Sequence, residues 1–185
     1  MNLIKRITDK ELFNLDGYSN IEPYRSVRVA LLDDRNLVAV LYLGKLNFFT
    51  LPGGGIDKRE TPEQALNREI QEETGCCSEI LYKLGIIEEN SMTYDWSGIS
   101  DCFIAKTKGE KGLLHLTQRE VEEETQVQWH KLHEALNIIV NQKNEESICA
   151  RNERESAIMK FISERDIALL NETIRLIKTN YVHKL

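Results

Sequence analysis

Hydrophobic residues form short runs in the first third of the chain. The segments Ser26–Leu32 and Leu37–Leu43 are rich in valine and leucine, and the polar residues 33–36 lie between them. Runs of this length separated by a polar loop predict two β-strands joined as a hairpin. Asn47–Leu51 is a third short candidate strand.

The next segment has the spacing and the end signals of a helix. Thr61 can cap the first turn, Pro62 suits the first helical position, and Gln64 completes a capping box. Aliphatic residues then recur at four-residue spacing, and Gly75 is a typical left-handed stop. These signals predict a helix from about Pro62 to Thr74.

The remaining pattern predicts further strands and two helical regions. The strands are expected at Ser78–Glu88, Asp101–Lys106 and Gln126–Trp129, and the helices at Leu132–Asn141 and Asn152–Tyr181. Ser163 is a candidate cap inside the last region, which therefore reads as two helical pieces. Together the elements predict a mostly antiparallel sheet with helices packed against it, in an α+β or α/β/α arrangement. Residues 1–145 are expected to form this domain, and residues 146–185 a helical extension packed on it or at a dimer interface.

Composition and charge exclude some classes of function. The chain has 185 residues, 41% hydrophobic and 29% charged, with a formal net charge of −6. An acidic chain of this kind argues against nucleic-acid binding, so no DNA-binding role is expected. No signal peptide and no membrane-spanning run are predicted. The four cysteines show no disulfide or metal-ligand spacing, so they are expected to be reduced thiols in the cytoplasm.

Three glutamates gather on one side of the predicted helix. Glu69, Glu72 and Glu73 are three or four residues apart or adjacent, and the last two lie where the helix dipole disfavours negative charge. An Mg²⁺ or Mn²⁺ ion would remove this conflict, because hard cations bind carboxylate oxygens. The preceding turn, Gly53-Gly54-Gly55, would let a phosphate approach the backbone. The alternative for each feature taken alone is an ordinary solvated face and an ordinary turn.

The spacing of these residues resembles the Nudix box, G-x5-E-x7-R-E-U-x-E-E-x-G-U, in which U is aliphatic. Gly54, Glu60 and the segment 68–76 occupy its fixed positions, and only Cys76 departs from the usual aliphatic residue. A small apolar thiol can fill the same space. The resemblance covers roughly residues 26–140 and implies an α+β fold, a Nudix-type α/β/α sandwich with a mixed β-sheet.

The resemblance also implies a metal-dependent hydrolase that cleaves a diphosphate bond. Glu72 and Glu73 would be the main metal ligands, Glu69 a third ligand or the general base, and the Gly53 carbonyl a further ligand. Bound Mg²⁺ or Mn²⁺ would neutralise charge on the diphosphate and activate a water molecule. The substrate would be a nucleoside triphosphate, a dinucleoside polyphosphate or a nucleotide-sugar.

Other residues of the box would be structural. Glu60 and Arg68 would form a salt bridge that braces the loop against the helix, and Gly54 and Gly75 would supply the two turns.

Members of this family often use another acidic residue from a later loop. Here the candidates are Glu120, Glu122, Glu123 and Glu124, and distance from Trp129 favours Glu123 or Glu124 as base or ligand. A solvated acidic loop is the competing interpretation.

The sequence constrains the substrate less closely, and it leaves other functions open. No proline follows the box, so the marker of ADP-ribose-type members is absent. Aromatic residues that could stack on a base, or simply fill the core, are Phe49, Tyr94, Trp96 and Trp129. A non-catalytic nucleotide sensor of the same fold is one alternative, and an isoprenoid diphosphate isomerase-like enzyme that uses Cys102 is another. A homodimer through the C-terminal helices is possible.

Overall fold

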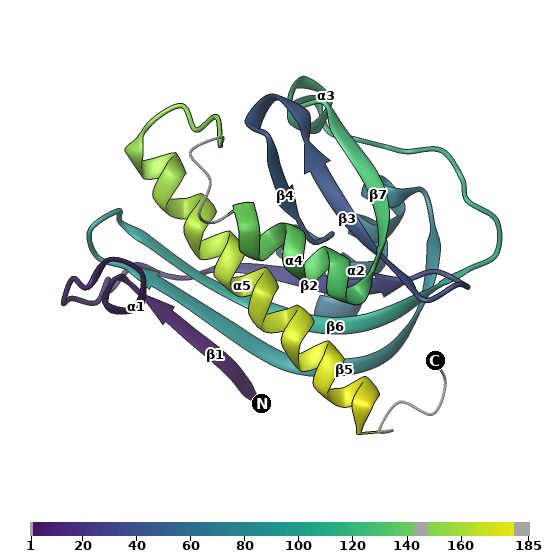
Figure 1. Ribbon diagram of the computed structural model, residues 1–185, viewed down its shortest axis with the longest axis horizontal. Coiled ribbons are helices and arrows are strands. Elements are labelled where there is room, and N and C mark those ends of the chain that lie inside the picture. The colour runs from purple at the N-terminus through teal and green to yellow at the C-terminus, as the bar shows by residue number, and fades with distance from the viewer. Residues whose placement is uncertain (1, 143–147, 180–185) are drawn as a thin grey trace.

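The computed structural model describes residues 2–142 and 148–179 (Figure 1). The expected domain boundary at residues 145–146 and the expected helix end at Tyr181 lie outside the described residues. The strands are β1 (Leu3–Thr8), β2 (Tyr24–Leu32), β3 (Leu37–Leu43), β4 (Phe48–Thr50), β5 (Cys77–Ser91), β6 (Trp96–Lys108) and β7 (Thr125–Lys131). The helices are α1 (Asp9–Phe13), α2 (Pro62–Thr74), α3 (Gln118–Glu122), α4 (Leu132–Gln142) and α5 (Glu153–Lys178), with a 3-10 turn η1 at Gly44–Leu46.

The described strands form one mixed sheet that opens at its middle. Its order is β1-β5-β6-β2-β3-β4, and β7 pairs with the other side of β3. The β1–β5 and β2–β6 pairs are parallel, and the other pairs are antiparallel. Strands β2 and β3 pair only at Leu32 and Val38, beside their connecting turn. Beyond that point β3, β4 and β7 diverge from β2 and β6 (Figure 1), and this divergence makes room for a cleft.

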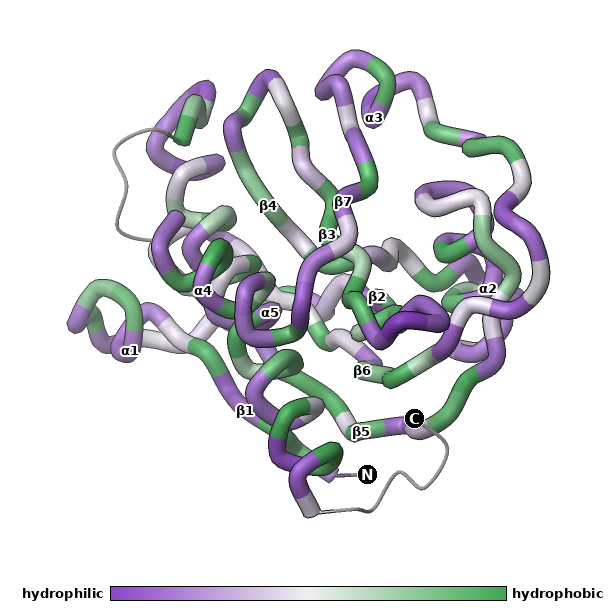
Figure 2. The backbone as a smooth tube through the Cα atoms, turned by 45° about the vertical axis from the view of Figure 1, so that its right-hand side comes forward, coloured by the Kyte–Doolittle hydropathy of each residue, from purple (hydrophilic) through white to green (hydrophobic). Residues whose placement is uncertain are grey.

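Helices cover both faces of the sheet, which confirms the predicted α/β/α fold with a C-terminal helix. Side chains of β2 alternate: Val27, Val29 and Leu31 pack with α2, whereas Ala30 and Leu32 pack with α4 and α5. Figure 2 shows hydrophobic segments along β4, β5 and β6 in the interior. In the described part of the chain, no helix is long and apolar enough to cross a membrane.

Helix α2 begins and ends as predicted. The Thr61 side chain accepts a hydrogen bond from the Gln64 N–H, and the Gln64 side chain accepts one from the Thr61 N–H. Gly75 ends the helix with φ 69°, and its N–H donates to the Gln71 carbonyl. Local signals therefore fix the helix that carries the glutamates.

The predicted break in the C-terminal helix was wrong, because α5 is continuous. Asn152 caps it by accepting a hydrogen bond from the Glu155 N–H at 2.9 Å. Ser163 is fully buried, and its hydroxyl accepts a hydrogen bond from the Gln142 side chain of α4 at 3.2 Å. This serine joins two helices and caps neither.

Candidate functional site

The glycine turn after β4 is fastened to β2 by its backbone. The Val27 N–H donates to the Gly54 carbonyl at 2.9 Å, and the Val29 N–H donates to the Pro52 carbonyl at 3.1 Å. Gly53 has φ +131°, and a Cβ there would lie 2.2 Å from the Val27 carbonyl oxygen. Only glycine fits this position. In the described part of the chain the Gly53 carbonyl accepts no hydrogen bond, so it can serve a ligand.

Two of the helix glutamates lie against this turn. The Gly53 N–H donates to Glu73 Oε2 at 2.7 Å. A Cβ on Gly54 would lie 2.3 Å from Glu69 Oε1, so the Glu69 carboxylate occupies the space that a side chain would need. Glu69 and Glu73 are 8% and 5% exposed. Burial raises the pKa of both carboxyl groups. The charge of Glu72 also raises the pKa of Glu69, and the charge of Glu69 raises the pKa of Glu73.

Arg68 binds the loop and the remaining carboxylates. Its guanidinium donates to both oxygens of Glu60 at 2.8 and 2.9 Å and to the Gly55 carbonyl at 2.9 Å. It also donates to Glu69 at 2.7 Å and to Glu72 at 3.2 Å. The hydrogen bond from Arg68 lowers the pKa of Glu60 to about 2. The structure thus brings Glu60 and Arg68 into the contact that was expected of a brace.

The three helix glutamates do not converge on a single point. Among residues 2–142 and 148–179, no group of three or more His, Cys, Asp or Glu side chains has the arrangement of a metal site. The reason is local: Arg68 holds Glu69 and Glu72, whereas the Gly53 N–H holds Glu73. The donor set still fits a hard divalent cation, because two buried carboxylates lie beside a carbonyl that accepts no hydrogen bond.

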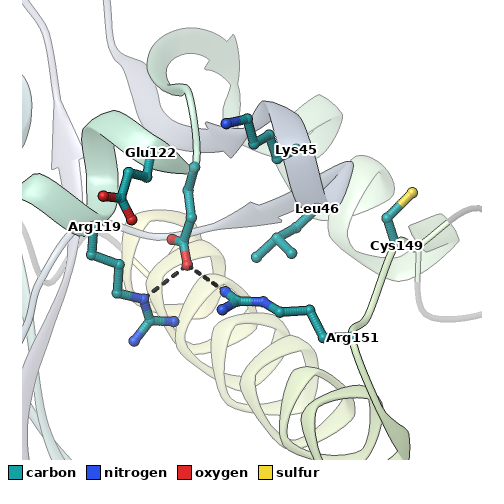
Figure 3. A pocket seen from close by; sticks show the side chains of 7 residues that line it. Lys45, Leu46, Arg119, Glu122, Cys149 and Arg151 are labelled. Atoms are coloured by element: carbon teal, nitrogen blue, oxygen red, sulfur yellow. Dashed lines mark hydrogen bonds and ion pairs between the residues drawn. The ribbon is translucent and has the colours of Figure 1, made fainter.

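The later acidic loop contributes Glu120 and Glu123 to the site in different ways. Glu120 lines the same cavity as Glu73, and its charge raises the pKa of Glu73. Glu123 is 7% exposed, and its Oε1 accepts from Arg119 at 2.8 Å and from Arg151 at 3.2 Å (Figure 3). Glu124 is exposed and lies 3.9 Å from the Lys45 ammonium.

Three adjoining cavities form one cleft along the opening of the sheet. The inner cavity, of about 190 Å³, reaches Gly53 and Glu73. The outer cavity, of about 470 Å³, contains the ion pairs of Glu123 (Figure 3). A third cavity, of about 130 Å³, lies beneath α5. The outer cavity is the largest of the three, but the inner one reaches Glu73 of α2, so the inner one is the candidate reaction site. Arg119 lines all three.

The sequence interpretation missed the arginines of this cleft. Arg28 interrupts the apolar run of β2, and its side chain lines both the inner cavity and the cavity under α5. A charged residue inside a buried strand was the signal that could have revealed it. Arg119 lies in an acidic stretch of the sequence, in which only the glutamates were predicted as site residues.

The candidate base-stacking aromatics lie elsewhere. Phe49 packs on Tyr42 with ring centroids 4.7 Å apart, Tyr94 packs on Phe13 at 5.6 Å, and Trp96 packs on Tyr24 at 6.4 Å. Trp129 packs against the core on the α2 side. None of the four candidates lines the three cavities of the cleft.

Cys102 is fully buried, and its thiol donates to the Ser100 carbonyl. Burial raises the pKa of this thiol. It does not line the cleft, so it is poorly placed for acid–base chemistry on a diphosphate.

Known proteins share this fold. The model of the NUDIX domain family matches residues 23–151. The structure of a MutT protein from Methanosarcina mazei Go1 aligns with TM-score 0.52 and 16% identity, covering 85% of this chain and 99% of that one. A UDP-X diphosphatase aligns with TM-score 0.51 and 18% identity, covering 90% of this chain and 68% of that one. An ADP-ribose pyrophosphatase from Streptococcus suis aligns with TM-score 0.50 and 14% identity, covering 83% of this chain and 93% of that one. No curated protein matches the chain.

Proposed function

Since the chain belongs to the NUDIX domain family, and is therefore a Nudix hydrolase that acts on pyrophosphate bonds, we propose that it cleaves a nucleotide-type diphosphate with the help of Mg²⁺ or Mn²⁺. One observation carries the proposal. The carboxylates of Glu69 and Glu73, buried on α2, lie against the glycine turn at the inner end of a cleft.

Glu72, Glu73 and Glu69 would hold the cation, together with the Gly53 carbonyl. The cation would supply positive charge for the diphosphate oxygens and a bound water of lowered pKa. Cation binding would compete with protonation of Glu69 and Glu73, because burial raises the pKa of both carboxyl groups in the metal-free protein. Glu72, which is one-third exposed, would have to turn away from Arg68.

A carboxylate near this cluster would accept the proton of the attacking water. Glu69 is one candidate. In the later loop we favour Glu120 over Glu123 and Glu124, because Glu120 lines the cavity of Glu73 and its charge raises the pKa of Glu73. Glu123 lines the same cavity, but two arginines hold it and it would orient Arg119. Glu124 is exposed and does not line the cavity.

The substrate would be a nucleoside triphosphate, a dinucleoside polyphosphate or a nucleotide-sugar. The named activities of the structural neighbours, on UDP-X and on ADP-ribose, belong to proteins that share the fold at low identity. They help to choose the compounds for an assay. The cytoplasmic location stays a prediction, and so does a homodimer, although the apolar residues of α5 already pack on the sheet of their own chain.

A panel of these compounds, with Mg²⁺, with Mn²⁺ and with EDTA, tests the proposal. We expect metal-dependent release of a nucleoside monophosphate or of pyrophosphate from at least one class. If a compound binds by calorimetry but none is cleaved with either metal, the chain acts as a sensor and the proposal fails.

A further inference from the structure

The side chain of Glu120 is held by the residue three positions before it. The Thr117 N–H donates to Glu120 Oε2 at 2.6 Å, and the Thr117 hydroxyl donates to the same oxygen at 2.8 Å. In return, the Glu120 N–H donates to the Thr117 hydroxyl oxygen at 3.3 Å. These bonds form a capping box at the start of α3, and they fix one carboxylate oxygen of Glu120 with two donors.

The other oxygen of Glu120 has no partner within the protein. In the described part of the chain, Oε1 accepts no hydrogen bond and Glu120 forms no ion pair. The other glutamates of this loop, Glu122, Glu123 and Glu124, each have a hydrogen-bond or ion-pair partner there. Thr117 lines the inner cavity together with Glu120. A carboxylate with one oxygen fixed and the other unoccupied suits a group that accepts a proton.

Backbone hydrogen bonds tie this loop to the helix that carries the candidate metal ligands. The Gly112 N–H donates to the Gly75 carbonyl at 2.6 Å, and the His115 N–H donates to the Glu72 carbonyl at 2.9 Å. A Cβ on Gly75 would lie 2.6 Å from the Gly112 carbonyl oxygen, so a glycine here lets the loop approach. The loop is therefore fastened to α2 just before Thr117, and the capping box extends this constraint to the carboxylate.

We propose that Thr117 is a positioning residue, which holds the Glu120 carboxylate in place to accept the proton of the attacking water. The proposal rests on the proposed function, because that function supplies the water and the diphosphate. In that step the water oxygen bonds to phosphorus and its proton passes to Glu120. The bridging oxygen leaves with the electron pair of the broken P–O bond.

The hydroxyl of Thr117 matters because Glu120 is only partly buried. Without this donor, the carboxylate would keep one of its two hydrogen bonds to Thr117 and could turn into other rotamers towards solvent. Displacing a catalytic group by about 1 Å can cost on the order of a hundredfold in rate. Loss of the hydroxyl should therefore lower kcat more than it changes substrate binding.

The test is a double-mutant cycle of Thr117→Val and Glu120→Gln, with the best substrate of the panel and its metal. We expect Thr117→Val to lower kcat at least about tenfold while KM stays within about twofold of the parent. Thr117→Ser keeps the hydroxyl, so its kcat should stay within about threefold of the parent. In the Glu120→Gln background, Thr117→Val should change kcat by less than about twofold, because the group through which it acts is gone.

Thr8→Val is the matched control. Thr8 and Glu11 form the same kind of capping box at the start of α1, and neither residue lines the cleft. Its kcat and KM should stay within about twofold of the parent. Three results would overturn the proposal: an equal loss of kcat in Thr8→Val, no recovery in Thr117→Ser, or an undiminished effect of Thr117→Val in the Glu120→Gln background.

A second measurement depends neither on activity nor on the folding of a variant. In the unmodified, metal-free protein, three-bond coupling constants should show a single side-chain rotamer for Glu120. They should show averaging for Glu110, an exposed glutamate of the same loop whose side chain has no partner among the described residues. Averaged couplings at Glu120 would overturn the proposal.

Failure of this proposal can be distinguished from failure of the proposed function. If the parent cleaves no compound of the panel, the hydrolase proposal fails and the role of Thr117 falls with it. If the parent cleaves a compound and Glu120→Gln turns it over equally fast, the hydrolase proposal stands and the role of Thr117 alone is overturned.

Discussion

Asp166 joins the C-terminal helix to the strand that leads into the glycine turn. It is fully buried, and its Oδ2 accepts hydrogen bonds from the Thr50 hydroxyl at 2.7 Å and the Leu51 N–H at 2.9 Å. Its Oδ1 accepts from the Arg165 Nε at 2.9 Å. Substituting Asp166→Ala would leave three donors without their acceptor, one of them a buried cation.

The expected loss of stability in Asp166→Ala follows from the charge of Arg165, which would have no carboxylate partner. Removing one partner of a buried ion pair costs roughly 3–5 kcal/mol, because the other charge stays out of water. For a chain of this size each kcal/mol lowers the melting temperature by roughly 2–4 °C, so the expected drop is on the order of 6–20 °C.

Urea unfolding of the metal-free protein at pH 7, followed by circular dichroism, measures this cost. The matched control is Asp16→Ala, which removes an aspartate that is 87% exposed in its ion pair with Lys10 and should cost about 0–1 kcal/mol. If Asp166→Ala lowers the free energy of unfolding by less than about 1 kcal/mol, the reasoning is refuted. Such a result would mean that water or another residue compensates the charge of Arg165.

Three further predictions concern the loop and the glutamates. Gly53→Ala should destabilise the protein by roughly 2 kcal/mol or more, because the added Cβ would meet the Val27 carbonyl. The control is Gly109→Ala, which should cost about 1 kcal/mol because Gly109 has φ +76° but no atom within 4 Å of an added Cβ. Thermal unfolding of the two variants measures the difference. The pKa of Glu60 is depressed to about 2, so its stabilisation is present above its ordinary value of 4.5 and is lost as the pH falls towards 2. Glu60→Gln should therefore be less stable than the parent at pH 7, and urea titrations should show the gap closing near pH 2. The pKa of Glu73 is raised in the fold, so its stabilising effect is complete below 4.5 and is lost as the pH rises through the raised value. In EDTA, Glu73→Gln should match the parent near pH 4 and exceed its stability at pH 8; equal stability at both pH values would contradict the shift.

Local chemistry made α2 predictable from the sequence. The cap at Thr61, the proline at position 62 and the stop at Gly75 act within a few residues of the helix. The hairpin strands were predictable for the same reason, since β2 and β3 alternate around a short polar turn. The glutamates could be placed on one side of the helix before any tertiary contact was known.

Tertiary contacts decided what the sequence could not reveal. Ser163 has the character of a helix cap, but burial against Gln142 keeps α5 continuous. In strand β1 only Ile7 is fully buried, so its sequence lacks a clear alternation of hydrophobic and polar residues. This strand forms through its parallel pairing with β5. The direction of the Arg28 side chain depends on β4 and α5, which lie far away in the sequence.

The most direct test of the central claim is metal-dependent hydrolysis by Glu73→Gln beside Glu63→Gln. Both glutamates lie on α2, but Glu73 is buried at the glycine turn, whereas Glu63 is exposed in the first turn, 3.7 Å from the Lys83 ammonium. On the best substrate of the panel, we expect Glu73→Gln to lose at least about a hundredfold in kcat while it keeps its fold, and Glu63→Gln to stay within about twofold of the parent. Undiminished metal-dependent turnover by a folded Glu73→Gln would contradict the account.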